Sequence, residues 1–227
     1  HQVTVGMNAW DIRSLMYNKF HEKHIELSQV VLGLSHMESY QHPIVDDDST
    51  IEKGSIIKIV VGSRYFDMFH SASQLVKVGE KVTPYEMKVY QALVDLGLQF
   101  ASSFTSGTTE SAIYDSIYPI AEDLEISYQL QTFSESAFTH HLGGPIGPLG
   151  NRDFLITKGG ERKIFPYSQF AINPVDSLLF HKYELQGIVL PEGKPIIMDE
   201  FDLVEEDYLS VSYNGSQLRV PTIISRE

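Results

Sequence analysis

The segment from Thr139 to Asp153 has the most unusual chemistry in the chain, because two adjacent histidines, His140 and His141, precede a run rich in glycine. Histidine titrates near neutral pH and serves as an acid, a base or a metal ligand. Glycine lets the backbone approach a ligand closely. The segment therefore predicts either a functional site or a glycine-rich connection with two surface histidines. Its glycine spacing does not match a dinucleotide-binding fingerprint, and no strand–helix frame surrounds it.

The charge balance excludes several classes of partner. The chain of 227 residues has 17 Lys and Arg against 30 Asp and Glu, a formal net charge of −13. Nucleic acids and anionic membranes are bound by clustered basic residues, which this sequence lacks. Its apolar runs are too short to span a bilayer, and without cysteine it has no disulfides or thiol chemistry. We therefore expect no nucleic-acid partner and no membrane partner.

Two helix starts are clear from local signals. Asn8 is a good N-cap for a helix over about Ala9–His24, whose apolar residues recur at helical spacing. Thr83, Pro84 and Glu86 combine an N-cap, a proline at the first helical position and a capping box. These signals predict one helix near the start of the chain and another that begins at Pro84.

The other elements repeat one order, helices first and strands after them. A further helix is expected from about Thr108, with a kink or an early end at Pro119. Asn214-Gly215 predicts a tight hairpin. Strands are expected at 56–61, 62–76, 128–133, 164–172, 183–190, 194–198, 208–213 and 217–224. Helices followed by strands, twice over, predict an α+β fold with helices on one face of an antiparallel sheet.

Six segments, in order, resemble those of the creatinase/methionine aminopeptidase/prolidase family. They are Val5-Gly6-Met7-Asn8, Tyr40-Gln41-His42-Pro43, Val60–Tyr65, His140–Gly147, Asn173-Pro174 and Lys182–Leu185. The resemblance runs from about residue 3 to about residue 200. It implies the pita-bread fold, a curved antiparallel sheet with helices on the outer face and two pseudo-symmetric halves. It also implies that residues 1–227 form one domain, with a tail at about 199–227, from the C-terminal part of a longer homodimeric chain.

The resemblance further implies a site for two divalent metals, held by two Asp, one His and two Glu. These positions fall on Val60, Ser71, Gly144, Asn173 and Glu184. Only the last is a carboxylate, and the side chains of valine and glycine offer no metal donor. One carboxylate cannot hold a dinuclear centre. We therefore expect no metal and no other cofactor.

Other pocket positions are partly kept, as the resemblance implies. His42 falls on the substrate-pocket histidine and is the candidate acid or base, and His140 is the first histidine of the glycine-rich motif. A small amino-acid or peptide-like ligand is the expected partner. The residues expected to bind it are Glu184, Asn151, Arg152, Ser71 and Asn173.

Three functions stay open at this point. In the first, the chain is a metal-independent hydrolase of C–N bonds that uses His42 as acid or base, as the resemblance to creatinase implies. In the second, it is a non-catalytic pseudo-enzyme that binds a ligand or a protein. In the third, it is an active Xaa-Pro dipeptidase whose metal ligands lie at other positions. Structural roles also stay open: His42 as a loop residue, and Glu184 as a buried carboxylate satisfied by Arg152 or Arg64. The cellular location is open, and the cytoplasm is favoured.

Overall fold

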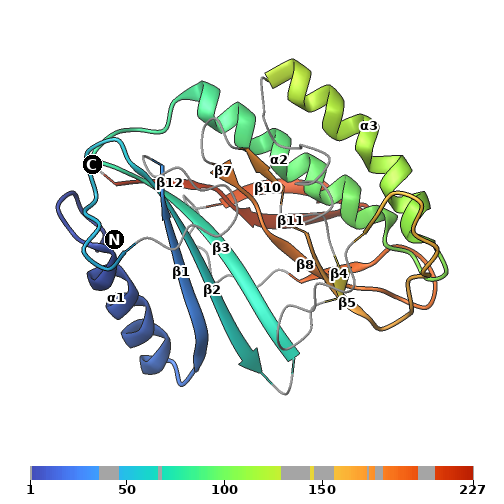
Figure 1. Cartoon of the computed structure of the whole chain (residues 1–227), viewed down its shortest axis with the longest axis horizontal. Coiled ribbons are helices and arrows are strands. Elements are labelled where there is room, and N and C mark those ends of the chain that lie inside the picture. Colours follow the sequence, from blue (N-terminus) through green and yellow to red (C-terminus); the bar gives the residue numbers. More distant parts are fainter. Residues whose placement is uncertain are drawn as a thin grey trace.

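The computed structural model describes residues 2–35, 46–65, 68–128, 144–145, 156–172, 174–176, 181–198 and 208–226. Helices and strands alternate in groups, as the α+β prediction requires (Figure 1). The elements are α1 (Ala9–Glu22), β1 (Leu27–Leu34), β2 (Ile56–Tyr65), β3 (Met68–Val78), α2 (Pro84–Ser103), α3 (Glu110–Tyr128), β4 (Gly144–Pro145), β5 (Gln169–Ile172), β6 (Val175–Asp176), β7 (His181–Lys182), β8 (Leu185–Ile188), β9 (Ile196–Met198), β10 (Tyr208–Tyr213), β11 (Ser216–Pro221) and β12 (Ile223–Arg226).

The predicted helix starts are confirmed by their caps. The side chain of Asn8 accepts a hydrogen bond from the backbone N of Asp11 at 2.9 Å, and the Asp11 carboxylate accepts one from the Asn8 backbone N. Thr83 and Glu86 form the same reciprocal box at the start of α2. The predicted early end at Pro119 is wrong, because α3 continues past it to Tyr128. Tertiary packing therefore outweighs the hydrogen bond that proline removes.

The strands within the described residues form two four-stranded sheets and two pairs. The first sheet has the order β1-β2-β3-β12, antiparallel except for the parallel pair of β12 and β3, and the second has the order β4-β5-β8-β9. The predicted boundary between the first two strands is wrong: β2 runs on to Tyr65, and β3 starts at Met68. The hairpin turn is confirmed, since Asn214 and Gly215 both have positive φ between β10 and β11.

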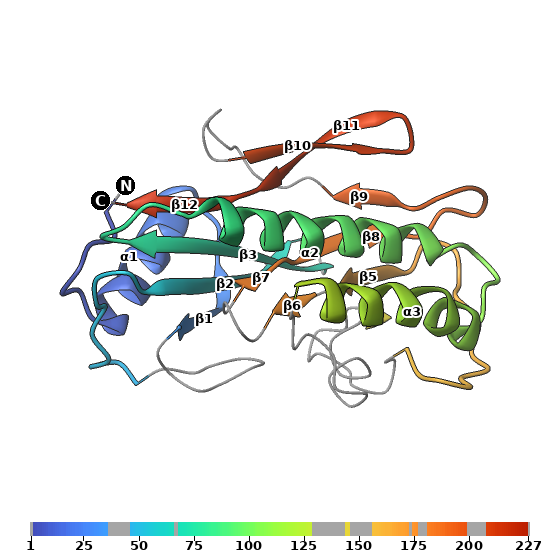
Figure 2. The same cartoon turned by 90° about the horizontal axis from the view of Figure 1, so that it is seen from above.

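The helices cover two separate cores. Ile12 of α1 packs with Ile57 of β2 and Val76 of β3 in one core, whereas Leu75 of β3 belongs to the core beneath α2 and α3. Side chains alternate along a strand, so β3 contributes to both cores at neighbouring residues. Figures 1 and 2 show α1 beside β1, and α2 and α3 side by side along the other half of the molecule.

Aromatic stacking joins α2 to the second sheet. The rings of Phe104, just after α2, and Phe170 in β5 are stacked with centroids 4.4 Å apart. Both side chains are buried. None of the described helices is long and apolar enough to cross a membrane.

Candidate functional site

The pairing of β2 with β3 fixes which residues share the site-bearing face of the first sheet. Val60 lies opposite Ser73, and Lys58 lies opposite Leu75. Residues directly opposite each other in an antiparallel pair point to the same face, as do residues two apart along a strand. Lys58, Val60 and Ser73 therefore share one face, which we call the inner face.

The inner face of the first sheet is closed to solvent at these residues. Val60 is 3% exposed, Ser73 5% and Lys58 2%. Lys58 makes polar or electrostatic interactions, as a buried ammonium must. Ser71 pairs with Gly62 in the same ladder. The two first-sheet positions that the family resemblance assigns to metal ligands, Val60 and Ser71, thus lie near each other on adjacent strands.

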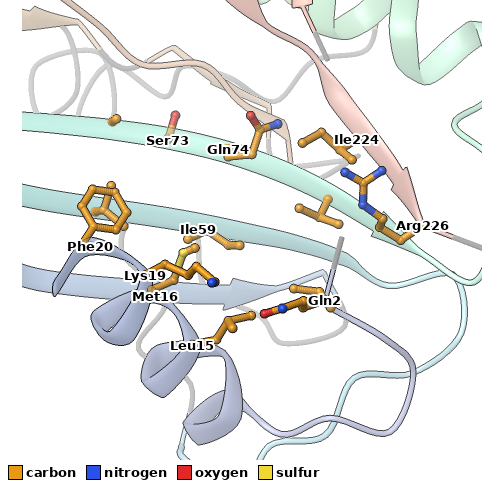
Figure 3. A pocket seen from close by; sticks show the side chains of 14 residues that line it. Gln2, Leu15, Met16, Lys19, Phe20, Ile59, Ser73, Gln74, Ile224 and Arg226 are labelled. Carbon is orange, nitrogen blue, oxygen red and sulfur yellow. The ribbon is translucent and has the colours of Figure 1, made fainter. Parts of the chain in front are cut away.

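The opposite face of the first sheet carries a different feature. An apolar groove of about 510 Å³ lies between α1 and this outer face, lined by Leu15, Met16 and Phe20 of the helix and by Ile59 of β2, among others (Figure 3). Ser73 borders the groove, but its hydroxyl points away from α1 (Figure 3). Glu184 is not among the described residues that line the groove.

Register also relates the expected residues of the second sheet. Gly144 of β4 pairs with Ala171 of β5, which pairs with Gln186 of β8. Gln186 is buried, and its Oε1 accepts a hydrogen bond from Gln169 Nε2 at 3.2 Å. This hydrogen bond satisfies the buried amide of Gln186 without adding a charge.

Glu184 immediately precedes β8 and is 9% exposed. Its neighbours Tyr183 and Leu185 both belong to the core beneath α2. In an extended segment the side chain between two such neighbours points the other way. The Glu184 carboxylate is thus directed away from α2, and it makes at least one polar or electrostatic interaction.

Tyr183 anchors the Glu184 segment against α2. Its ring meets the ring of Tyr90 edge-on, with centroids 6.3 Å apart, and its backbone N donates to Pro174 O at 3.0 Å. A Cβ added at Gly97 would lie 3.0 Å from the Tyr183 ring, so glycine permits this close approach. Burial raises the pKa of Tyr90 well above its ordinary value, and its hydroxyl stays protonated and donates to Pro221 O at 2.8 Å.

A buried ion pair anchors β3. Lys77 Nζ lies 2.8 and 2.9 Å from the two carboxylate oxygens of Glu86, in the first turn of α2. Burial alone would raise the pKa of Glu86, but hydrogen bonds from Lys77 and Thr83 and the Lys77 charge together lower it. The pair stays ionised and fixes the end of the strand that carries Ser71 and Ser73.

Strand β3 joins the first sheet to the segment that carries Glu184. Strand β3 contacts both β7 and β8, the strands on either side of Glu184. Segments far apart in sequence, β3 and the strands that flank Glu184, are thus neighbours in the fold. That the site residues of the two sheets converge stays a prediction.

Most of the predicted site residues belong to segments outside the described part of the chain. His42, His140, Asn151, Arg152 and Asn173 lie outside the described residues, and of Ser71 only the backbone is described. The suggested partners of Glu184, Arg152 and the Arg64 side chain, lie outside as well. These assignments stay predictions.

The described residues do not fit the metal centre that the family implies. Val60 and Gly144 have no donor atoms in their side chains. Within the described ranges, no group of three or more His, Asp or Glu could hold a metal ion. The histidines of the glycine-rich segment lie outside the described residues, so the expectation of a metal-free site stays a prediction.

Sequence reasoning missed two residues of the inner face, Lys58 and Ser73. Both are polar positions within branched, apolar strands. The period-2 alternation around Val60 places Lys58 on its face. Ser73 could be found only from the pairing register of β2 with β3, which local sequence does not give.

Comparison with solved structures shows the same fold. The chain superposes on X-Pro aminopeptidase from Thermotoga maritima with a TM-score of 0.68 and 17% identity, covering 86% of this chain and 54% of that one. For prolidase from Pyrococcus furiosus the TM-score is 0.67 and the identity 15%, covering 89% and 58%. For dipeptidase PepE from Mycobacterium ulcerans the TM-score is 0.67 and the identity 16%, covering 86% of this chain and 51% of that one. The chain thus spans little more than half the length of these structures.

Comparison of sequences adds the family. No curated protein gives a significant match. Residues 1–210 match the profile of metallopeptidase family M24, nearly the whole chain. The pita-bread fold expected from the motifs is confirmed by the structural neighbours. The chain therefore belongs to metallopeptidase family M24.

Proposed function

We propose that this domain binds a small ligand with a primary amine, an amino acid or short peptide, in the region between β3 and Glu184, and that it does so without a dinuclear metal centre. The observation that carries the proposal is the buried side chain of Val60 on the inner face. It stands where the family resemblance expects the first metal-binding carboxylate.

The retained carboxylate gives the ligand class. Glu184 is buried and directed away from the α2 core. With no metal to bind, a carboxylate in such a place suits an ammonium group, because a charge-assisted hydrogen bond offsets part of its desolvation. Binding is the function that the described residues support best. Hydrolysis of a C–N bond would in addition require His42 as acid or base within reach of the substrate.

The test measures binding of the dipeptide Ala-Pro by isothermal titration calorimetry, with and without EDTA. We expect the same affinity in both, and no release of alanine on addition of Mn²⁺. Glu184→Gln should weaken binding by about 10–100-fold, the value of a hydrogen bond to a charged group. N-acetyl-Ala-Pro, which lacks the amine, should bind weakly to both proteins.

The matched control is Glu192→Gln, the same change at an exposed residue near the second sheet, which should leave the affinity unchanged. Hydrolysis of Ala-Pro that EDTA abolishes, or Mn²⁺ retained through dialysis, would refute the metal-free proposal. Hydrolysis that persists in EDTA and is lost in His42→Ala would make the domain a metal-independent hydrolase.

A further inference from the structure

Among the described residues, the hydroxyl of Ser73 is a buried polar group without a partner. Its Oγ is closed to solvent and has no hydrogen-bond partner among the residues that the structure describes. A buried hydroxyl with no partner is destabilising, because it has lost its hydrogen bonds to water. Such groups are uncommon in folded proteins, and each calls for a physical reason.

The position of Ser73 gives that reason. It lies directly opposite Val60 and shares its face, and its hydroxyl points away from α1 and the outer groove (Figure 3). Strand β3 also contacts the strands on either side of Glu184. The hydroxyl of Ser73 therefore lies on the inner face of the first sheet, the face that carries Val60.

We propose that Ser73 is a ligand-binding residue whose hydroxyl donates a hydrogen bond to a carbonyl oxygen of the ligand. The inference rests on the proposed function and adds a second contact: Glu184 binds the amine, and Ser73 binds the adjacent carbonyl. A hydroxyl can donate to a carbonyl with no charge in either group. The hydrogen bond that the folded domain leaves unmade is made when the ligand enters.

This arrangement predicts opposite effects of one substitution on stability and on binding. Ser73→Ala removes the unpartnered hydroxyl, so the melting temperature of the ligand-free protein should rise by about 2–4 °C. The same variant should bind Ala-Pro about tenfold more weakly than the wild type. A hydroxyl with a purely structural role would give a lower melting temperature and unchanged binding.

Ser55 supplies a matched control, because it is equally buried at 5% exposed but makes polar interactions within the protein. Ser55→Ala should lower the melting temperature and leave the affinity for Ala-Pro unchanged. A second probe isolates the carbonyl: in the reduced-amide analogue of Ala-Pro a methylene replaces the first carbonyl. Wild type and Ser73→Ala should bind this analogue equally.

The outcomes separate this inference from the proposed function. If Glu184→Gln weakens binding of Ala-Pro but Ser73→Ala does not, the role of Ser73 is refuted and the proposed function stands. A melting temperature that falls in Ser73→Ala likewise refutes it, since the hydroxyl then has a partner in the folded domain. If the wild type binds neither Ala-Pro nor its analogue, both proposals fail together.

Discussion

Replacing Glu86 with glutamine removes the negative charge that faces the buried Lys77 ammonium. Both residues are among the buried charged groups of the described chain, and Lys77 Nζ contacts both oxygens of the carboxylate. The same carboxylate accepts hydrogen bonds from Thr83 N at 2.7 Å and Thr83 Oγ1 at 2.8 Å. Glutamine keeps one acceptor oxygen but presents an NH₂ group where the second oxygen was.

The expected loss follows from these contacts. Removing one partner of a buried ion pair costs about 3–5 kcal/mol, because the remaining charge stays buried without compensation. The capping box at the start of α2 is weakened as well, at a cost of about 0.5–2 kcal/mol. The side chain of Glu86 is 12% exposed, so water relieves part of the penalty. We expect Glu86→Gln to lower the free energy of unfolding by about 3 kcal/mol at pH 7.

The pH dependence has a definite sign. The pKa of Glu86 is lowered in the folded state, so its contribution is complete above the pKa of the unfolded chain. It is lost as the pH falls through the lower, folded-state pKa. The difference in stability between wild type and Glu86→Gln should therefore shrink below the ordinary glutamate pKa of about 4.3.

Urea unfolding followed by far-UV circular dichroism, at pH 7 and at steps down to pH 3, measures both effects. Glu122→Gln is the control, since it makes the same change at an exposed residue of α3 and should shift stability by less than about 0.5 kcal/mol. If Glu86→Gln at pH 7 costs no more than this control, the ion pair does not hold β3 to α2, and the reasoning is wrong.

Two further substitutions test packing around the site. Gly187→Ala should lower the free energy of unfolding, measured in urea, by about 1–3 kcal/mol. The added Cβ would overlap the ring of Phe170 and lie 2.9 Å from Ile196 O. An unchanged urea midpoint would mean that these close contacts of β8 are not present. Tyr90→Phe should lower the free energy of unfolding by about 1 kcal/mol, because Pro221 O loses its hydrogen bond from the Tyr90 hydroxyl. Exchange of the amide hydrogens in β12 should become faster. An unchanged exchange rate would mean that this hydrogen bond does not stabilise β12.

The sequence predicted best what is decided locally. The caps at Asn8 and Thr83 and the turn at Asn214-Gly215 depend on residues within four positions of each other, and all three are confirmed. Boundaries that depend on distant partners were missed. The strand predicted over 164–172 begins only at Gln169, because Tyr167 N and Ser168 O bond to Val189 and form the turn before it.

The last strand shows the same limit. The sequence predicted one strand over 217–224, but β11 ends at Pro221 and β12 leaves the hairpin to pair in parallel with β3. Gln74 Nε2 donates to Thr222 O at the point where the chain changes partner. No residue within the hairpin indicates that the chain after Pro221 pairs with β3, which is distant in sequence. The alternation of apolar and polar residues alone therefore could not show that 217–224 holds two strands.

Position and chemistry are separable at the candidate site. The ladder that places Val60 opposite Ser73 is made by backbone groups and does not depend on the side chains. A buried valine suits such a strand, whereas a carboxylate in the same place would need a metal or a cation to offset its desolvation. Strand pairing can therefore persist when a metal-binding carboxylate is replaced. For this reason motifs along the sequence were enough to predict the fold, whereas the chemistry of the site depends on individual side chains, which strand pairing does not determine.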